Sequence, residues 1–150
     1  MTVVVIDTNI LIAGILKDHI VRHILLSKNI KFVIPEDAIQ EVERNKADII
    51  EKSGLSKEEF ESLFKVILKN ITILPHTLVK SKIKDAIDIV RDIHINDAPF
   101  IAAALVVENE GLWSFDEHLK KQKKVKILTT REVNKFIYFF SHSTSAGSSS

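Results

Sequence analysis

The stretch Thr2-Val3-Val4-Val5-Ile6, followed at once by Asp7-Thr8-Asn9, decides the fold of this chain. Its first five residues are almost all β-branched and apolar, and they do not alternate with polar residues. Such a run is typical of a strand that is buried on both faces, as in a parallel sheet covered by helices. We therefore expect a parallel sheet, with Asp7 just beyond the carboxyl end of its first strand.

Strands and helices alternate along the rest of the sequence. Further strands are predicted at 31–34, 71–74, 112–115 and 125–128. Apolar spacing and capping signals predict helices at 8–16, 20–27, 36–52, 56–70, 78–92 and 97–109, and a last helix from Thr129 or Thr130 to about 140. This order predicts an α/β fold, a single-domain α/β/α sandwich with a mainly parallel five-stranded sheet.

Short local signals set several of these boundaries. Ser56 and Glu59 match a capping box, in which the two side chains satisfy each other's backbone N–H groups at the start of a helix. Gly54 is a stop signal for the preceding helix, and Gly111 is another for the helix before the fourth strand. Asn96 is a suitable N-cap for the helix that begins at residue 97.

Composition bounds the class of protein. With 150 residues, of which 45% are hydrophobic, the chain suits one globular domain over 1–140, and the Ser-rich tail 141–150 is expected to be disordered. A tail added for expression would have the same composition. The absence of cysteine excludes disulfides, thiolate zinc sites and a cysteine nucleophile. No basic leader and no apolar run of about 20 residues is present, so we expect a soluble cytoplasmic protein without a membrane span.

Four carboxylates stand where elements of the predicted fold begin or end. Open α/β sheets bind ligands outside the carboxyl ends of their strands. Asp7 follows the first strand and Asp116 the fourth, so both face one crevice if these strands are neighbours. Asp97 begins a predicted helix, and Glu41 lies at the rim of an apolar helix stripe. Carboxylates that share a crevice repel each other unless a cation joins them, which predicts a divalent metal.

Each acid taken alone has an ordinary structural explanation. Asp7 and Asp116 could simply cap the helices that follow them. Asp97 could be a helix acid of the first turn, favoured by the helix dipole, and Glu41 a solvated helix residue, with Glu36, Asp37 and Glu43 on the same helix. The order of all four acids and their neighbours is therefore what indicates a site.

That combined pattern resembles the PIN-domain nucleases, most closely the small toxins of VapC type and their archaeal relatives. The resembling segments are Val5-Ile6-Asp7-Thr8-Asn9, Ile39-Gln40-Glu41-Val42, Asn96-Asp97-Ala98-Pro99-Phe100-Ile101-Ala102-Ala103-Ala104 and Leu112-Trp113-Ser114-Phe115-Asp116. The resemblance covers about residues 2–140. It implies a metal-dependent endoribonuclease that cuts single-stranded RNA, commonly as a homodimer and with an antitoxin protein as partner.

The resemblance also implies roles for individual residues. The catalytic acids would be Asp7, Glu41, Asp97 and Asp116, and the ligands of Mg²⁺ or Mn²⁺ would be Asp7, Asp97 and Asp116. Thr8 and Asn9 would stabilise the loop or the bound phosphate. Ser114 matches the small hydroxyl residue that usually precedes the last acid by two positions.

Basic residues near the acids are candidates for contact with RNA. Net charge is only +1, so the distribution of charge has to provide that contact. Five lysines follow Asp116, and they could track a nucleic-acid backbone or could simply be solvated: Lys120, Lys121, Lys123, Lys124 and Lys126. His19 and His23 have the spacing of a helical metal pair but no third ligand in view. His94 could contact substrate but is expected to be a loop residue.

Other functions remain open from the sequence alone. A PIN nuclease could act in RNA processing or on structured DNA, and a non-catalytic PIN domain could serve as a binding module. A phosphate-receiving signalling domain would want paired acids after its first strand, whereas Asp7 has no acidic neighbour. The four intact acids favour an enzyme over a binding module.

Overall fold

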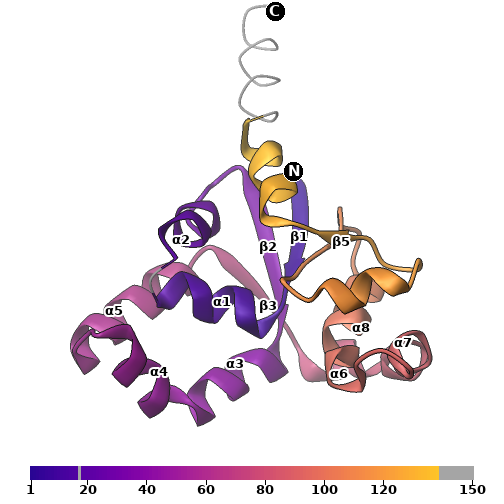
Figure 1. Ribbon diagram of the computed structural model, residues 1–150, viewed down its shortest axis with the longest axis horizontal. Coiled ribbons are helices and arrows are strands. Elements are labelled where there is room, and N and C mark those ends of the chain that lie inside the picture. The colour runs from indigo at the N-terminus through magenta and orange to yellow at the C-terminus, as the bar shows by residue number, and fades with distance from the viewer. Residues whose placement is uncertain (17, 139–150) are drawn as a thin grey trace, which may run out of the picture.

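The computed structural model describes residues 1–16 and 18–138, and in them five parallel strands form one sheet. The strands lie in the order β3-β2-β1-β4-β5 (Figure 1). Their bounds are β1 Thr2–Ile6, β2 Ile30–Pro35, β3 Ile71–Leu74, β4 Leu112–Trp113 and β5 Ile127–Leu128. The predicted parallel sheet is confirmed, although β4 and β5 are shorter than the sequence indicated.

β1 is the central strand of the sheet. Its Val5 pairs with Val33 of β2 on one side and with Leu112 of β4 on the other. The chain adds β2 and β3 on one side of β1, and then returns to add β4 and β5 on the other side. The order of the strands therefore reverses at β1, and a binding crevice is expected beyond the carboxyl ends of β1 and β4.

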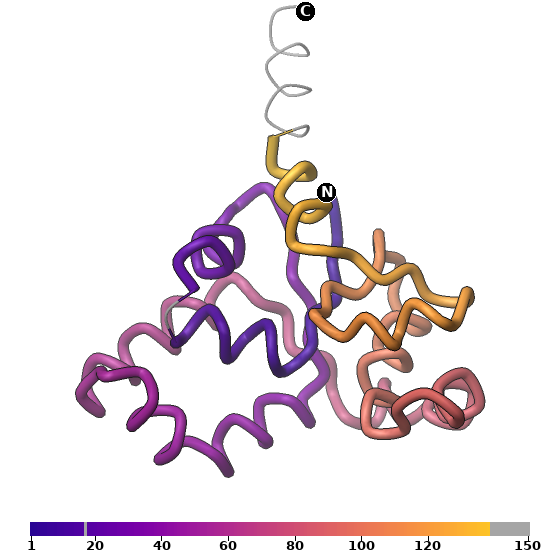
Figure 2. The backbone as a smooth tube through the Cα atoms, viewed as in Figure 1, coloured from indigo at the N-terminus to yellow at the C-terminus, as the bar shows by residue number. Residues whose placement is uncertain are grey.

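Helices cover both faces of the sheet, as expected of an α/β/α sandwich. One group follows β1 and β2 and lies on one side of the strands in Figures 1 and 2: α1 Thr8–Ile15, α2 His19–Leu25, α3 Glu36–Arg44, α4 Lys46–Ser53 and α5 Lys57–Leu68. The other group lies on the opposite side: α6 His76–Lys80, α7 Ile83–Val90 and α8 Ala98–Val106. Two short 3-10 helices are η1 Ile95–Asp97 and η2 Glu117–Lys121. None of the described helices is long and apolar enough to cross a membrane.

The core is built on the apolar strands and on two aromatic rings. Phe32 of β2 and Trp113 of β4 are fully buried, with ring centroids 6.0 Å apart. The indole N–H of Trp113 donates to the Thr130 hydroxyl at 3.0 Å, so its one polar atom is satisfied. Helical structure runs through residues 130–138. The hydrogen bond from Trp113 to Thr130 therefore ties this last helix to β4. The predicted tail 141–150 lies outside the described residues.

Two predicted helices are each divided in the structure. The helix expected over 36–52 breaks at Asn45, whose side-chain amide donates to the Glu41 carbonyl at 2.9 Å. A side chain that binds its own backbone competes with the helical bond pattern, which explains the break. The helix expected over 78–92 is α6 and α7, separated at Ser81 and Lys82. The hydroxyl of Ser81 donates to the Leu78 carbonyl at 2.6 Å, which is the same kind of competition.

The helix before β4 also differs from its prediction at both ends. Asn96 is not its N-cap, because residues 95–97 form η1 and α8 begins at Ala98. α8 ends at Val106, and the Asn109 side chain lies beyond it, donating to the carbonyls of Ala104 and Val107 at 2.8 and 2.7 Å. Asn109 therefore satisfies carbonyl groups that the helix end leaves open.

The predicted capping box and one glycine stop are confirmed, and the other glycine has a different role. The Ser56 and Glu59 side chains cap α5 reciprocally, and Gly54 ends α4 with φ of 72°. Gly111 does not end a helix; it precedes β4 with φ of 149°, and a Cβ atom there would lie 2.7 Å from the Lys126 carbonyl oxygen. Only glycine allows β4 to approach the residues before β5 this closely.

Substitution of these two glycines should separate backbone strain from crowding. Gly54→Ala places a side chain at positive φ but in open space, and should cost about 1 kcal/mol of unfolding free energy. Gly111→Ala adds a clash with backbone and should cost at least about 3 kcal/mol. Urea denaturation followed by circular dichroism measures both values. Equal losses in the two variants would contradict the close approach at Gly111.

Candidate active site

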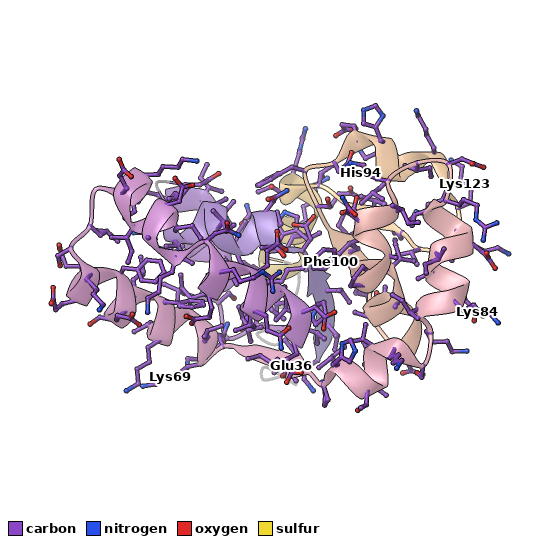
Figure 3. The ribbon with its side chains drawn as sticks, turned by 90° about the horizontal axis from the view of Figure 1, so that it is seen from below. Glu36, Lys69, Lys84, His94, Phe100 and Lys123 are labelled. Carbon is purple, nitrogen blue, oxygen red and sulfur yellow. The ribbon has the colours of Figure 1, made fainter. Side chains whose placement is uncertain are left out.

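The carboxyl ends of β1 and β4 bring distant parts of the chain together. Ile6 pairs with Trp113, so the residues that follow them, Asp7 and Ser114, leave the sheet side by side. Both side chains are buried, and the Ser114 hydroxyl binds the Asp7 carboxylate. The first and fourth strands are therefore neighbours, as the predicted crevice requires. Figure 3 looks at this end of the molecule from below.

A hollow of about 400 Å³ opens at this position. It is lined by Asp7, Thr8, Asn9, Glu41, His94, Asn96, Asp97 and Phe100. These residues come from the junction of β1 with α1, from α3, and from the segment between α7 and α8; His94 and Phe100 are labelled in Figure 3. A larger hollow of about 560 Å³ lies at the opposite end of β1 and has only Glu108 and Glu110 as acids, so its size does not make it the better candidate.

Asp7 is the most deeply placed of the acids. Its residue is only 5% exposed, and its Oδ1 accepts the Ile10 N–H at 3.1 Å as the N-cap of α1. Burial raises the pKa of Asp7 from 3.8 to about 6, and the negative charges of Asp97 and Asp116 add to this rise. Hydrogen bonds from Ser114 and Ile10 oppose the rise without cancelling it. Asp7 therefore caps α1 and lines the hollow at the same time.

Asp97, Asp116 and His94 form the one group of potential metal ligands found among the described residues. Their ligand atoms all lie within 4.8 Å of one another. The His94 Nδ1 is 3.0 Å from Asp97 Oδ2 and 3.4 Å from Asp116 Oδ2. Burial raises the pKa of Asp97 and Asp116 raises it further, whereas His94 lowers it. The hydrogen bond with Asp97, and then its charge, raises the pKa of His94.

Glu41 is the acid of α3 that reaches the hollow. Its Oε2 accepts the Thr8 hydroxyl at 3.0 Å, which holds the side chain toward Asp7. Asp37 instead pairs with His76 at 2.9 Å on the surface, and Glu43 is exposed. Of the acids that the sequence left open on this helix, Glu41 is therefore the one in position.

Other residues of interest lie elsewhere or were missed. Lys120 and Lys121 follow Asp116 on η2, and the Lys120 ammonium pairs with Glu117 at 3.0 Å. Four of the lysines line a separate hollow, away from the acids: Lys120, Lys123, Lys124 and Lys126. His19 and His23 are exposed on α2 and belong to no ligand group among the described residues.

His94 was expected to be a loop residue, and the structure places it beside Asp97 and Asp116. Its spacing of three from Asp97 was the sequence signal that it faces the same site.

The donor set fits a divalent cation. Carboxylate oxygens with one imidazole nitrogen are common ligands of such ions. The charges of Asp97 and Asp116 raise the pKa of Asp7, and the charge of Asp116 raises the pKa of Asp97, which is the repulsion that a bound cation would relieve. Asp7 lies outside the group formed by His94, Asp97 and Asp116 but touches the same hollow.

Comparison with known families gives one match over most of the chain. The family model described as PIN domain matches residues 5–137. The chain belongs to the PIN-domain family. A search of curated proteins finds no match. PIN domains have a nuclease-type fold and typically use divalent metals, so the acidic hollow at the strand ends is where this family's chemistry would be expected.

The raised pKa of Asp7 predicts how stability depends on pH when metal is removed by a chelator. An acid whose pKa is higher in the folded than in the unfolded chain binds more protons when folded, so acid stabilises the fold. For Asp7 this stabilisation is present at low pH and is lost as pH rises through about 6. The loss of unfolding free energy from this group is up to about 3 kcal/mol. Asp97, whose pKa is also raised, acts in the same direction.

Asp7→Asn should therefore be more stable than the wild type at pH 7.5 and should lose less stability between pH 5 and 7.5. Asparagine keeps an oxygen that can accept the Ile10 N–H. Asp18→Asn is the matched control, because Asp18 caps α2 in the same way, through the Val21 N–H at 3.0 Å, on the exposed surface. Urea denaturation at each pH makes the measurement. An identical pH dependence in wild type and Asp7→Asn would show that burial of Asp7 has no such effect.

Proposed function

We propose that this PIN domain is an endoribonuclease that uses Mg²⁺ or Mn²⁺ to hydrolyse phosphodiester bonds of single-stranded RNA. One observation supports this above the others. Acids from four separate segments, Asp7, Glu41, Asp97 and Asp116, converge at the strand ends of a chain that matches the PIN family over residues 5–137. A merely structural set of helix caps would have no reason to converge in this way.

The acids divide into two roles in this proposal. Asp7, Asp97 and Asp116 hold the cation, which when bound activates a water molecule and neutralises charge on the phosphate. Asp97 and Asp116 remain partly open to solvent, with side chains 17% and 25% exposed, so they meet an incoming phosphate group. Glu41, held by Thr8, faces the same hollow and orients water there. Ser114 positions Asp7 and also accepts the Asp116 N–H at 3.1 Å.

RNA must approach a site whose own charges repel it. Thr8 and Asn9 lie at the start of α1 and line the hollow, where they can contact a phosphate. Lys120 and Lys121 follow Asp116 on η2, outside the lining of the hollow, and are candidates for contact with the RNA backbone beyond it. The preference for a single strand is taken from the family resemblance, and the cytoplasm is the proposed place of action.

We further propose that the protein is the toxin of a toxin–antitoxin pair and acts as a homodimer. Both ideas come from the resemblance to PIN toxins. An antitoxin segment with an arginine would complement the carboxylates of the hollow. In the last helix, Phe136 and Ile137 pack against the core and Tyr138 is 69% exposed, so the Tyr138 side chain is the candidate contact with a second copy. A nuclease of RNA processing and a non-catalytic PIN module are the alternatives.

Cleavage of a labelled single-stranded RNA tests the proposal. Wild type should cut with Mg²⁺ or Mn²⁺ and stop in chelator, and Asp7→Asn should be at least about 100-fold slower, because it removes a charge that holds the cation. Asp18→Asn should cut like the wild type. Binding of RNA without cleavage by any of the three proteins would favour the binding module. Growth arrest by expressed wild type, but not by Asp7→Asn, would separate a toxin from a processing enzyme.

A further inference from the structure

His94 places an imidazole nitrogen between two carboxylates of the hollow. Its Nδ1 lies 3.0 Å from Asp97 Oδ2 and 3.4 Å from Asp116 Oδ2. Neighbouring ligand atoms of an octahedral cation, each about 2.1 Å from the ion, are about 3 Å apart. Both distances from the His94 Nδ1 are close to that spacing, and all three donor atoms lie within 4.8 Å of one another.

The backbone fixes where this imidazole can reach. The His94 N–H donates to the Val90 carbonyl at 3.0 Å at the end of α7, and the His94 carbonyl accepts the Asp97 N–H at 3.0 Å. The residue is thus held between α7 and η1, three positions before Asp97. Its side chain is 59% exposed, so the imidazole covers the solvent side of the two more recessed carboxylates. A cation entering from solvent would meet all three groups together.

An ordinary surface pair elsewhere in the chain shows what is different here. The His76 Nδ1 lies 2.9 Å from Asp37 Oδ1, and the His76 side chain is 56% exposed, close to the value for His94. His76 contacts one carboxylate and belongs to no ligand group among the described residues, whereas His94 contacts two carboxylates that line or adjoin the hollow. A simple ion pair does not require the second carboxylate.

We propose that His94 is a direct ligand of the cation and makes this site select a transition-metal ion over Mg²⁺. Mg²⁺ prefers oxygen ligands and gives up its water reluctantly, so it gains little from an imidazole. Transition-metal ions gain affinity from nitrogen donors. Of the two ions in the proposed function, on which this inference rests, His94 favours Mn²⁺.

Metal binding without RNA tests the role of His94. Calorimetric titration of metal-free protein with Mn²⁺ and with Mg²⁺ should show that His94→Ala loses at least about tenfold in affinity for Mn²⁺. Its affinity for Mg²⁺ should change much less. His76→Ala, the matched control, should bind both ions like the wild type. Pulsed electron paramagnetic resonance of bound Mn²⁺ should show coupling to an imidazole nitrogen in wild type and His76→Ala, and none in His94→Ala.

Three results would overturn this role. They are no nitrogen coupling in the wild type, an equal loss of affinity for both ions in His94→Ala, and a gain for both ions, which would mean that His94 acts only as a competing positive charge. The outcome is separable from that of the RNA assay. Nitrogen-coupled Mn²⁺ without RNA cleavage would refute the ribonuclease and leave His94 as a ligand. Equal RNA cleavage with Mg²⁺ and Mn²⁺, without nitrogen coupling, would support the ribonuclease and refute His94 as a ligand.

Discussion

The pairing of β1 with β4 is the constraint on which the candidate site depends. These strands are 107 positions apart in sequence at the pair Ile6 and Trp113, and their pairing places Asp7 beside Ser114. The next turn of chain after Ser114 then brings Asp116 to the same edge. Without the reversal of strand order at β1, the strands that end at Asp7 and Ser114 would not be neighbours, and the acids would lie on separate surfaces.

Gathering these carboxylates has a cost in stability, and the surrounding groups limit it only in part. Ser114 and the Ile10 N–H favour the charged form of Asp7, yet burial and the neighbouring acids leave its pKa at about 6. His94 does the same for Asp97, and the pKa of Asp97 is still raised. The fold therefore retains unfavourable electrostatics at one edge of the sheet, where Asp7 is buried. Such retained cost is a feature of sites arranged for a ligand rather than for stability.

The sequence predicts those features that depend on local chemistry or on long patterns. The strand 2–6, the capping box at Ser56 and the parallel sheet follow from periodicity and from residue type. The break at Asn45 could not be placed from sequence, because an asparagine in a helical pattern can point outward or bind its own backbone, and only tertiary packing decides between the two. His94 was missed for a related reason, since its contact with Asp116 joins segments 22 residues apart.

The capping explanation and the catalytic explanation of the acids turn out to be compatible. The Oδ1 of Asp7 accepts the Ile10 N–H, and the Oδ1 of Asp116 accepts the His118 N–H while its Oδ2 faces His94. A cap that occupies one carboxylate oxygen fixes the rotamer, and so it aims the other oxygen. Asp18 caps α2 in the same way, but it is exposed and does not line the hollow at the strand ends. Sequence can identify an aspartate cap; the topology of the sheet determines which caps become part of a site.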